Sequence, residues 1–124
     1  MTPEATALLK ERHPSLFEGI HFGCGDGWFN LLDVLAKGID QRAPGVCRAV
    51  QVKEKFGGLR FYLSTYDEKD IDLRAADEIH GMVWMAESLS YYTCEECGVP
   101  GSRRPAMWVR TLCDTCDKGQ KANG

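Results

Sequence analysis

Long apolar runs and histidines are both scarce in this sequence. Its 124 residues include three histidines, and its longest apolar stretches span only a few residues. A membrane-spanning helix needs about 20 consecutive apolar residues. The first residues also lack the basic region followed by an apolar region that marks a secretory signal. We therefore expect no membrane attachment, no secretion and a cytoplasmic location.

A strong excess of positive charge is absent as well. Lys and Arg number 15 against 18 Asp and Glu, which gives a formal net charge of −3. This balance argues against sequence-independent binding to the phosphate backbone of a nucleic acid. The charge is unevenly distributed, because residues 46–66 carry +3 and residues 67–93 carry −5. A local basic surface is therefore compatible with the composition.

Four of the six cysteines form two pairs with the spacing of metal ligands. The pairs are Cys94 with Cys97 and Cys113 with Cys116, and 15 residues separate them. Four soft sulfur ligands around one ion are typical of tetrahedral zinc. Redox-active pairs are the alternative, but neither pair has the strand-to-helix context of a thioredoxin-like motif. The sequence predicts a closed, structural Zn²⁺ site whose removal should unfold this part of the chain.

The segment between the cysteine pairs is expected to contribute a strand. Residues 106–112 are apolar and rich in residues that favour strands, which predicts a C-terminal zinc ribbon. Residues 118–124 are polar and without periodicity, so we expect them to fray. These patterns divide the chain into an α+β core over 1–92, a zinc ribbon packed on it over 93–117, and a tail over 118–124.

Three helices are predicted before the cysteine pairs. Thr2-Pro3 indicates the start of a short helix that should end before His13-Pro14. The second helix follows residues 23–27, and Asp26 is placed to cap it. Its apolar side is formed by Trp28, Leu31, Leu32, Leu35 and Ile39. The third helix has its apolar side at Ile71, Ala75, Ile79, Met82, Ala86 and Leu89.

The third helix also has an acidic side. Its acidic residues are Asp72, Asp77, Glu78 and Glu87. A solvated surface is one explanation of this charge. The alternatives are that the helix neutralises the basic segment before it, or that it mimics an anionic partner.

From residue 46 to residue 64 the apolar period changes to two, which predicts a β-hairpin. With Gly57-Gly58 as a two-residue turn, residues 56 and 59, 54 and 61, and 52 and 63 would pair. The apolar side would then contain Val50, Val52, Phe56, Leu59, Phe61 and Leu63. Lys55 and Arg60 would lie directly opposite each other, which is unfavourable without a nearby anion. Glu54 does not fit the apolar side, so it either pairs with a basic residue or marks a bulge.

Two groups of side chains are candidates for binding a ligand or a partner. The hairpin supplies basic and aromatic side chains that could contact phosphate and stack on bases. The expected zinc ribbon adds two arginines and a tryptophan, although the tryptophan could instead pack on the metal loops while the arginines are solvated. The full set is Lys53, Lys55, Arg60, Tyr62, Arg103, Arg104 and Trp108.

Evidence for catalysis in the sequence is weak. His21, Cys24 and Asp26 lie close together before a helix, where a thiol can have a lowered pKa. They are local neighbours, however, and no general base or oxyanion site can be assigned. We therefore do not favour an enzyme, and we expect Cys24 and Cys47 to be free thiols.

Three sequence strings resemble a group of small uncharacterised proteins encoded by tailed bacteriophages and prophages. The strings are residues 24–29 (CGDGWF), residues 51–62 (QVKEKFGGLRFY), and the paired cysteines with residues 97–101 (CGVPG). The resemblance spans most of residues 20 to 116 and implies a phage accessory protein acting in the cytoplasm of a bacterial host. It implies no catalytic residues.

These observations lead to two functional hypotheses. The first is a non-enzymatic phage accessory protein with a structural zinc site that binds a host or phage protein, as an inhibitor of a host defence system. The alternative is binding or sequestration of an anionic ligand, either a nucleotide messenger or a nucleic acid, by the basic side of the hairpin. The fold predicted for both is α+β, with two main helices packed on a small antiparallel sheet and a C-terminal zinc ribbon.

Overall fold

The computed structural model describes residues 1–123, with side chains described as far as residue 120. Helix α1 runs from Pro3 to Arg12, and the hydroxyl of Thr2 accepts a hydrogen bond from the Ala5 N–H at 3.2 Å. The helix ends at His13, so both predicted ends are confirmed. No helix in the described residues is long and apolar enough to cross a membrane.

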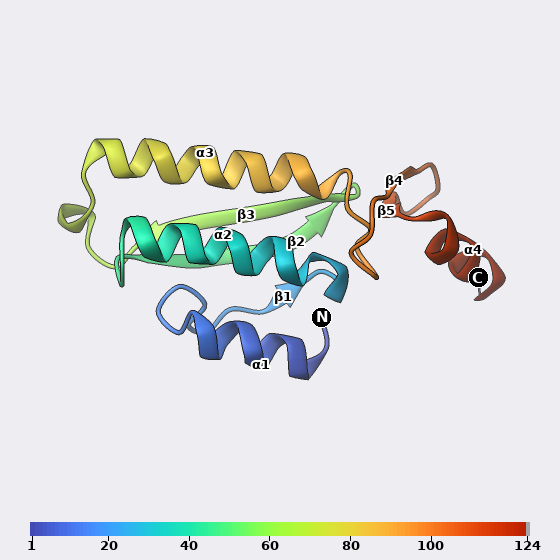
Figure 1. Ribbon diagram of the computed structural model, residues 1–124, viewed down its shortest axis with the longest axis horizontal. Coiled ribbons are helices and arrows are strands. Elements are labelled where there is room, and N and C mark those ends of the chain that lie inside the picture. The colour runs from blue at the N-terminus through green and yellow to red at the C-terminus, as the bar shows by residue number, and fades with distance from the viewer. Residues whose placement is uncertain (124) are drawn as a thin grey trace.

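Two longer helices form one layer of the fold. Helix α2 (Phe29–Arg42) follows a single 3-10 turn, η1 (Asp26–Trp28). Helix α3 (Leu73–Ser90) follows a second short turn, η2 (Glu68–Asp70), and is capped by the Asp72 carboxylate. Figure 1 shows α2 and α3 side by side along the sheet, and residues of their predicted apolar sides are buried, namely Leu32, Leu35 and Ile39 of α2 and Ala75, Ile79 and Ala86 of α3.

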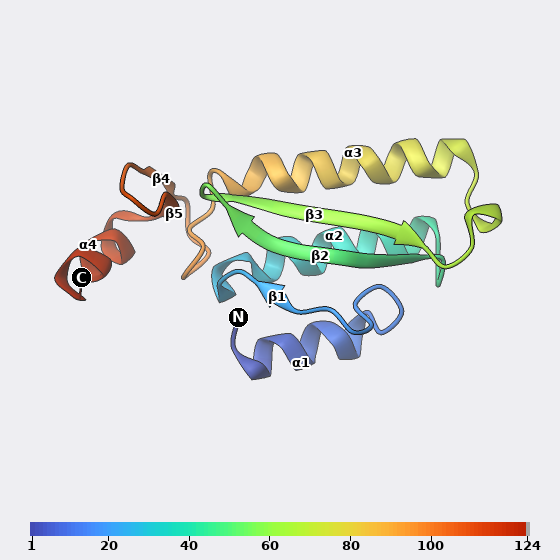
Figure 2. The same cartoon turned by 180° about the vertical axis from the view of Figure 1, so that it is seen from behind.

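The sheet has three strands in the order β1-β2-β3. Strands β2 (Cys47–Lys55) and β3 (Gly58–Thr65) form the predicted antiparallel hairpin, and β1 (Phe22–Gly23) pairs in parallel with β2. Helices α2 and α3 lie on one face, and Figure 2 shows the opposite face turned toward the viewer. The fold is therefore α+β, with a short parallel strand that the sequence pattern did not indicate.

The predicted register of the hairpin is wrong. Val52 pairs with Phe61 instead of residue 63, and Lys53 pairs with Arg60. The turn residues are Phe56 and Gly57, with φ of 54° and 83°, and not Gly57-Gly58. Because Phe56 is at the turn, its ring is 64% exposed and lies outside the core. Positive φ at both central residues matches the twist of a two-residue hairpin.

A bulge adds a second departure from the predicted hairpin. The register shifts between Ala49 and Gln51, so Val50 is turned outward and is exposed. Glu54 lies beyond this bulge, opposite Leu59, at the end of the hairpin. The bulge therefore does not explain Glu54, whose carboxylate accepts from the Gly57 N–H of the turn and from Trp108 in the C-terminal part of the chain.

Helix α3 covers the outer edge of strand β3. The Leu59 N–H donates to the Ser90 hydroxyl at 2.8 Å, and the Phe61 N–H donates to the Glu87 carboxylate at 2.9 Å. Glu78 on the same helix pairs with Arg42 and Arg74. Part of the acidic side of α3 is thus committed to the sheet edge and to neighbouring arginines, and Asp77 is exposed to solvent.

The buried His13 joins α1 to α2. Its two ring nitrogens lie 2.8 Å from Asp33 Oδ1 and 2.7 Å from Asp40 Oδ2. Burial raises the pKa of Asp33, but hydrogen bonds from His13 and Arg12 outweigh it and hold that pKa below its usual value. Asp26, the expected cap of α2, instead accepts a hydrogen bond from the Thr2 N–H at 2.8 Å. That prediction is wrong because the 3-10 turn places Asp26 a full turn before α2.

The C-terminal part consists of a short hairpin and a helix. Strands β4 (Ser102–Arg104) and β5 (Arg110–Leu112) are antiparallel, and helix α4 covers Asp114–Asn123. The expected strand over 106–112 is present only at 110–112, because residues 105–109 connect β4 to β5 and residues 105–108 of this connection are exposed. The residues expected to fray are helical as far as Asn123, and Gly124 lies outside the described residues.

Candidate functional site

The four paired cysteines form one cluster at the base of the β4-β5 hairpin. The Sγ atoms of Cys94, Cys97, Cys113 and Cys116 all lie within 4.8 Å of one another, and those of Cys97 and Cys113 are 3.7 Å apart. Tetrahedral zinc with Zn–S bonds of about 2.3 Å requires sulfur atoms about 3.8 Å apart. The donor set and its dimensions therefore fit a tetrahedral metal ion, with all four positions filled by protein.

Backbone groups shape the first half of this cluster. The Gly98 N–H donates to the Cys94 carbonyl at 2.9 Å, and Gly98 has a φ of 83°, which favours glycine. Burial raises the pKa of Cys94, but hydrogen bonds from the backbone of Cys113, Cys97 and Glu96 lower it to about 7 overall. These N–H groups favour a thiolate, which is the form that binds a metal ion.

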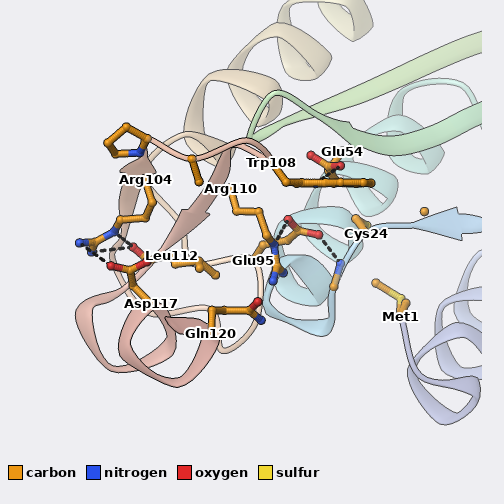
Figure 3. Close-up of a pocket in the computed structure, with 14 residues that line it drawn as sticks. Met1, Cys24, Glu54, Glu95, Arg104, Trp108, Arg110, Leu112, Asp117 and Gln120 are labelled. Atoms are coloured by element: carbon orange, nitrogen blue, oxygen red, sulfur yellow. Dashed lines mark hydrogen bonds and ion pairs between the residues drawn. The ribbon is translucent and has the colours of Figure 1, made fainter. Parts of the chain in front are cut away.

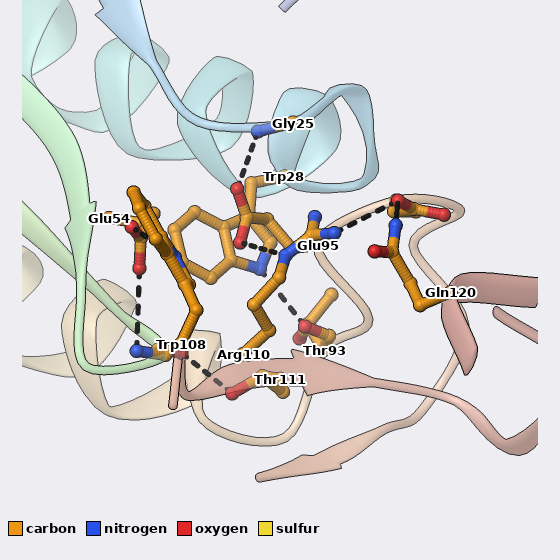
Figure 4. Close-up of polar contacts among 11 residues, drawn as sticks. Gly25, Trp28, Glu54, Thr93, Glu95, Trp108, Arg110, Thr111 and Gln120 are labelled. Atoms are coloured by element: carbon orange, nitrogen blue, oxygen red, sulfur yellow. Dashed lines mark hydrogen bonds and ion pairs between the residues drawn. The ribbon is translucent and has the colours of Figure 1, made fainter. Parts of the chain in front are cut away.

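The loop from Cys94 to Gly98, here called the metal loop, is joined to the core by the glycine-rich loop before α2 (Figure 4). The Gly27 N–H donates to the Glu95 carbonyl at 2.7 Å, and the Gly25 N–H donates to the Glu95 carboxylate at 2.9 Å. The fully buried Trp28 donates its indole N–H to the Thr93 carbonyl at 2.9 Å. A Cβ atom on Gly27 would collide with the Cys94 carbonyl. The CGDGW segment is thus the surface on which the metal loop packs.

The β2-β3 turn makes a second connection. The Thr111 hydroxyl donates to the Gly57 carbonyl at 2.6 Å and is fully buried. A Cβ atom on Gly58 would collide with the ring of Tyr91, so that ring packs directly on the glycine. The glycine-rich loop and the β2-β3 turn therefore both contact the part of the chain from residue 94 onward, here called the metal module.

A cavity of about 690 Å³, here called the junction pocket, lies between the α+β core and the metal module (Figure 3). Gly23, Cys24, Gly25 and Glu54 line it from the core. Glu95, Trp108, Arg110 and Gln120 line it from the metal module, and Met1 closes one side. The pocket combines an apolar wall with carboxylate and guanidinium groups.

Glu95 is the most deeply buried charged residue of the pocket. It is only 4% exposed, and its Oε1 atom has no hydrogen-bond donor among the described residues. The nearest cation is Arg110, whose Nε lies 3.6 Å from that oxygen. Arg110 directs a guanidinium N–H to Glu96 at 3.0 Å instead. Burial raises the pKa of Glu95, and the Gly25 N–H and Arg110 oppose that rise.

Trp108 covers the pocket without being buried in it. Its indole N–H donates to Glu54 Oε1 at 3.2 Å, so Glu54 accepts from this indole and the expectation of a basic partner is wrong. The tryptophan remains 70% exposed. It therefore does not pack over the metal loops, and its ring faces the pocket (Figure 3).

The three residues considered for catalysis do not form a reactive group. Cys24 lines the pocket, but burial and the nearby Glu95 raise its pKa to about 12. Asp26 is engaged with Thr2, and His21 is exposed on the surface. Cys47 is also buried, and burial raises its pKa. Neither free thiol has the lowered pKa of a nucleophile.

The candidate basic residues separate into different surroundings. Lys53 and Arg60 are cross-strand neighbours on the sheet face opposite the helices, where Tyr62 is exposed. The expected contact between Lys55 and Arg60 is wrong, since Lys55 pairs with Gly58 and its ammonium lies 5.6 Å from the Phe56 ring centre.

One tyrosine brings two of the arginines together. The Arg103 guanidinium lies 4.1 Å from the Tyr91 ring centre, and Arg60 donates to the Tyr91 hydroxyl at 3.4 Å. We call Lys53, Arg60, Tyr62, Tyr91 and Arg103 the basic face. Arg104 does not belong to it, because it donates to the Leu112 carbonyl at 2.9 Å and to Asp114 at 2.9 Å. Arg104 thus stabilises the metal module.

Helices α2 and α3 form an apolar pocket of about 770 Å³, here called the helix groove. Leu31 and Val34 line it from α2, and Met82, Met85 and Leu89 line it from α3. Gly27 and Gly98 form the end that lies against the metal loop. The helical period predicted Leu31, Met82 and Leu89 as core, but Leu89 is 49% exposed. Val34 and Met85 lie outside the predicted apolar sides. These additional apolar residues are the signal in the sequence from which the groove could have been predicted.

The sequence pattern does not indicate the role of Glu95. Glu95 stands between two metal ligands, where a solvated acidic residue is the ordinary expectation. Its burial depends on contacts with residues 25 and 27, far away in the chain. Comparison of the chain with family models, with curated proteins and with solved structures gives no match.

Proposed function

We propose that this protein is a non-enzymatic binding protein with a structural zinc ion, and that it docks a partner protein in the helix groove. The observation that carries this proposal is the exposed apolar lining of the groove. Met85 is 53% exposed, and Val34 and Leu89 beside it are also exposed. Contiguous apolar surface of this kind is typical of protein interaction sites, and methionine adapts well to a partner's shape.

The metal centre supports the same proposal. Four cysteines close the coordination sphere, so zinc would have no position for water or substrate and would act by folding the module. The metal loop also forms one end of the groove. An amphipathic helix of the partner, with its apolar side in the groove, is the occupant that this shape suits.

The resemblance to phage and prophage proteins supports a partner of host or phage origin in a bacterial cytoplasm. Inhibition of a host defence protein is the specific form of the proposal. Cys24, the thiol that lines the junction pocket, has a raised pKa, which does not favour a nucleophile.

A charge placed in the groove tests whether the partner binds there. The tagged Met85→Glu variant should recover at least tenfold less of the partner from phage-infected cells than the tagged wild-type protein does. The matched control is Met107→Glu, because Met107 is fully exposed on the β4-β5 connection and outside the groove. Quantitative mass spectrometry of the captured proteins is the measurement. Equal recovery by Met85→Glu, or no stoichiometric partner of the wild type, would contradict the proposal.

A second candidate function is recognition of an anionic ligand by the basic face. Lys53 and Arg60 are directly opposed like charges, and Arg103 stacks on the tyrosine that Arg60 contacts. Opposed cations are unfavourable in a sheet unless an anion compensates for them. The exposed Tyr62 offers a ring for stacking against a base.

A double substitution tests this candidate. Lys53→Ala with Arg60→Ala should weaken binding of nucleotides or oligonucleotides at least tenfold, as measured by isothermal titration calorimetry. Lys10→Ala with Lys37→Ala is the control, because these lysines lie on helices α1 and α2 and not on the basic face. Unchanged binding by the Lys53→Ala, Arg60→Ala variant would exclude the basic face as the ligand site. In that case the variant should be as stable as the wild type or more stable, because it loses the repulsion between two like charges.

A further inference from the structure

We propose that two copies of this chain form a symmetric dimer through the outer side of helix α3, with Trp84 of each copy in a hollow at the end of α3 in the other. We call Trp84, Ser88 and Tyr92 the dimer patch. None of these three residues lines the helix groove, so the proposal goes beyond the partner-binding function above.

The first observation is the lack of charge in the second half of α3. Glu87 is the only charged residue between positions 81 and 92, and its carboxylate accepts from the Phe61 N–H at the sheet edge. The first half of the helix, in contrast, exposes Arg74 and Asp77. Figures 1 and 2 show α3 along one border of the molecule. A helix with no charged side toward solvent is normally covered, so the second half of α3 has the composition of an interface.

The second observation is the pair of large aromatic side chains on this uncharged surface. Trp84 is 67% exposed, and Tyr92 is 71% exposed. Trp84 and Ser88 lie on successive turns of α3 and therefore on the same side of it. The chain continues as a turn to Tyr92, whose N–H donates to the Leu89 carbonyl at 2.9 Å. Exposed aromatic surface without charge is typical of the centre of a protein interface.

The third observation is a hollow of about 590 Å³ beside the dimer patch. Ser88, Tyr91 and Tyr92 line it from α3 and the turn that follows, and Ser102 and Arg103 line it from β4. The two serines are small, and the tyrosine rings and the guanidinium are favourable neighbours for an indole ring. The chain therefore has an exposed tryptophan and, one helical turn away, a hollow that suits a tryptophan.

The spacing of the patch suits a two-fold axis. When two antiparallel helices pack about such an axis, the residue on the axis meets its own copy, and residues equally far before and after it meet each other. Trp84 lies four residues before Ser88, and Tyr92 lies four residues after it. With Ser88 on the axis, Trp84 of each copy therefore faces the hollow at Tyr92 of the other. The small Ser88 side chain also allows the two helices to approach closely.

The surface area of the chain supports a second copy as the occupant. The accessible surface is 7520 Å², whereas a monomer of 13.8 kDa exposes about 6,600 Å². The difference of about 900 Å² is close to the area of about 800 Å² that each partner covers in an interface of ordinary size. An uncharged patch also suits pairing with itself, because like charges near the axis would repel each other.

Sedimentation equilibrium of the full, metal-loaded chain without nucleotide measures the association. Nucleotide is left out because the hollow shares Tyr91 and Arg103 with the basic face. The wild type should dimerise at micromolar concentration, and Trp84→Glu should raise the dissociation constant at least tenfold. The matched control is Tyr62→Glu, at an exposed aromatic residue on the sheet face opposite the helices, and it should dimerise like the wild type.

Two charge variants at one position locate the axis. Ser88→Lys and Ser88→Glu should each dimerise at least tenfold more weakly than the wild type, because each charge would meet its own copy. An equal mixture of the two, with one of them ¹⁵N-labelled, should form the mixed dimer in native mass spectrometry, because the charges are then opposite. Circular dichroism and metal content report the folding of each variant. The proposal is overturned if the wild type is monomeric, if Trp84→Glu dimerises like the wild type, or if the mixture forms no mixed dimer.

Discussion

Replacing Cys97 and Cys113 together by serine is expected to abolish zinc binding and to unfold the chain from residue 94 onward. The reason is that β4 and β5 contribute only three residues each, so the module has little core of its own. Structural zinc contributes about 10–16 kcal/mol to the folding of small zinc-finger peptides. Native mass spectrometry would report the lost ion, and amide NMR signals would report the lost structure.

The control for this experiment is Cys24→Ala, which removes a thiol outside the cluster. It should keep one zinc ion per chain and the full spectrum of the metal module. Signals from α2, α3 and the β2-β3 hairpin should persist in the double serine variant, because their buried residues form a core of their own. A double serine variant with a native spectrum for residues 94–120 would show that the cluster has no structural role.

Gly27→Ala is expected to destabilise the protein by about 3 kcal/mol or more. The added Cβ would collide with the Cys94 carbonyl, and relief would break the hydrogen bond from Gly27 to Glu95. Overpacking commonly costs about 1–3 kcal/mol, and each lost hydrogen bond adds about 1 kcal/mol. Urea unfolding of the metal-loaded protein, followed by Trp28 fluorescence in a Trp84→Phe, Trp108→Phe background, is the measurement.

The comparison is with Gly81→Ala on helix α3. A Cβ at Gly81 meets no atom within 4 Å, so this change should raise stability by about 0.5–1 kcal/mol through helix propensity alone. Opposite signs for the two substitutions would locate the effect at the junction. Equal effects would mean that the close approach of Gly27 to the metal loop contributes nothing.

The helices and the clustering of the four paired cysteines could be predicted because their signals are local. Apolar residues at spacings of three and four define α2 and α3, and the cap at Thr2 needs only a hydroxyl three residues before an N–H. The cysteine spacing acts similarly, since two residues between thiols turn both toward one ion. Each of these patterns depends on a few neighbouring residues.

The hairpin register could not be predicted because the deciding contact is distant in sequence. Two adjacent glycines favour a turn at both, yet Gly58 is needed where the Tyr91 ring packs on it. That leaves Phe56 to take the left-handed position beside Gly57. The same reason applies to Arg104 and Glu95, whose roles depend on residues that meet them only in the folded chain.

The cover that α3 provides for strand β3 restricts how other proteins can approach this one. The backbone N–H groups of Leu59 and Phe61 already have acceptors in Ser90 and Glu87. A foreign strand therefore cannot add to the sheet along this edge without displacing the helix, and the same cover protects the hairpin from edge-to-edge aggregation. At this part of strand β3, another protein can therefore contact the chain only through side chains.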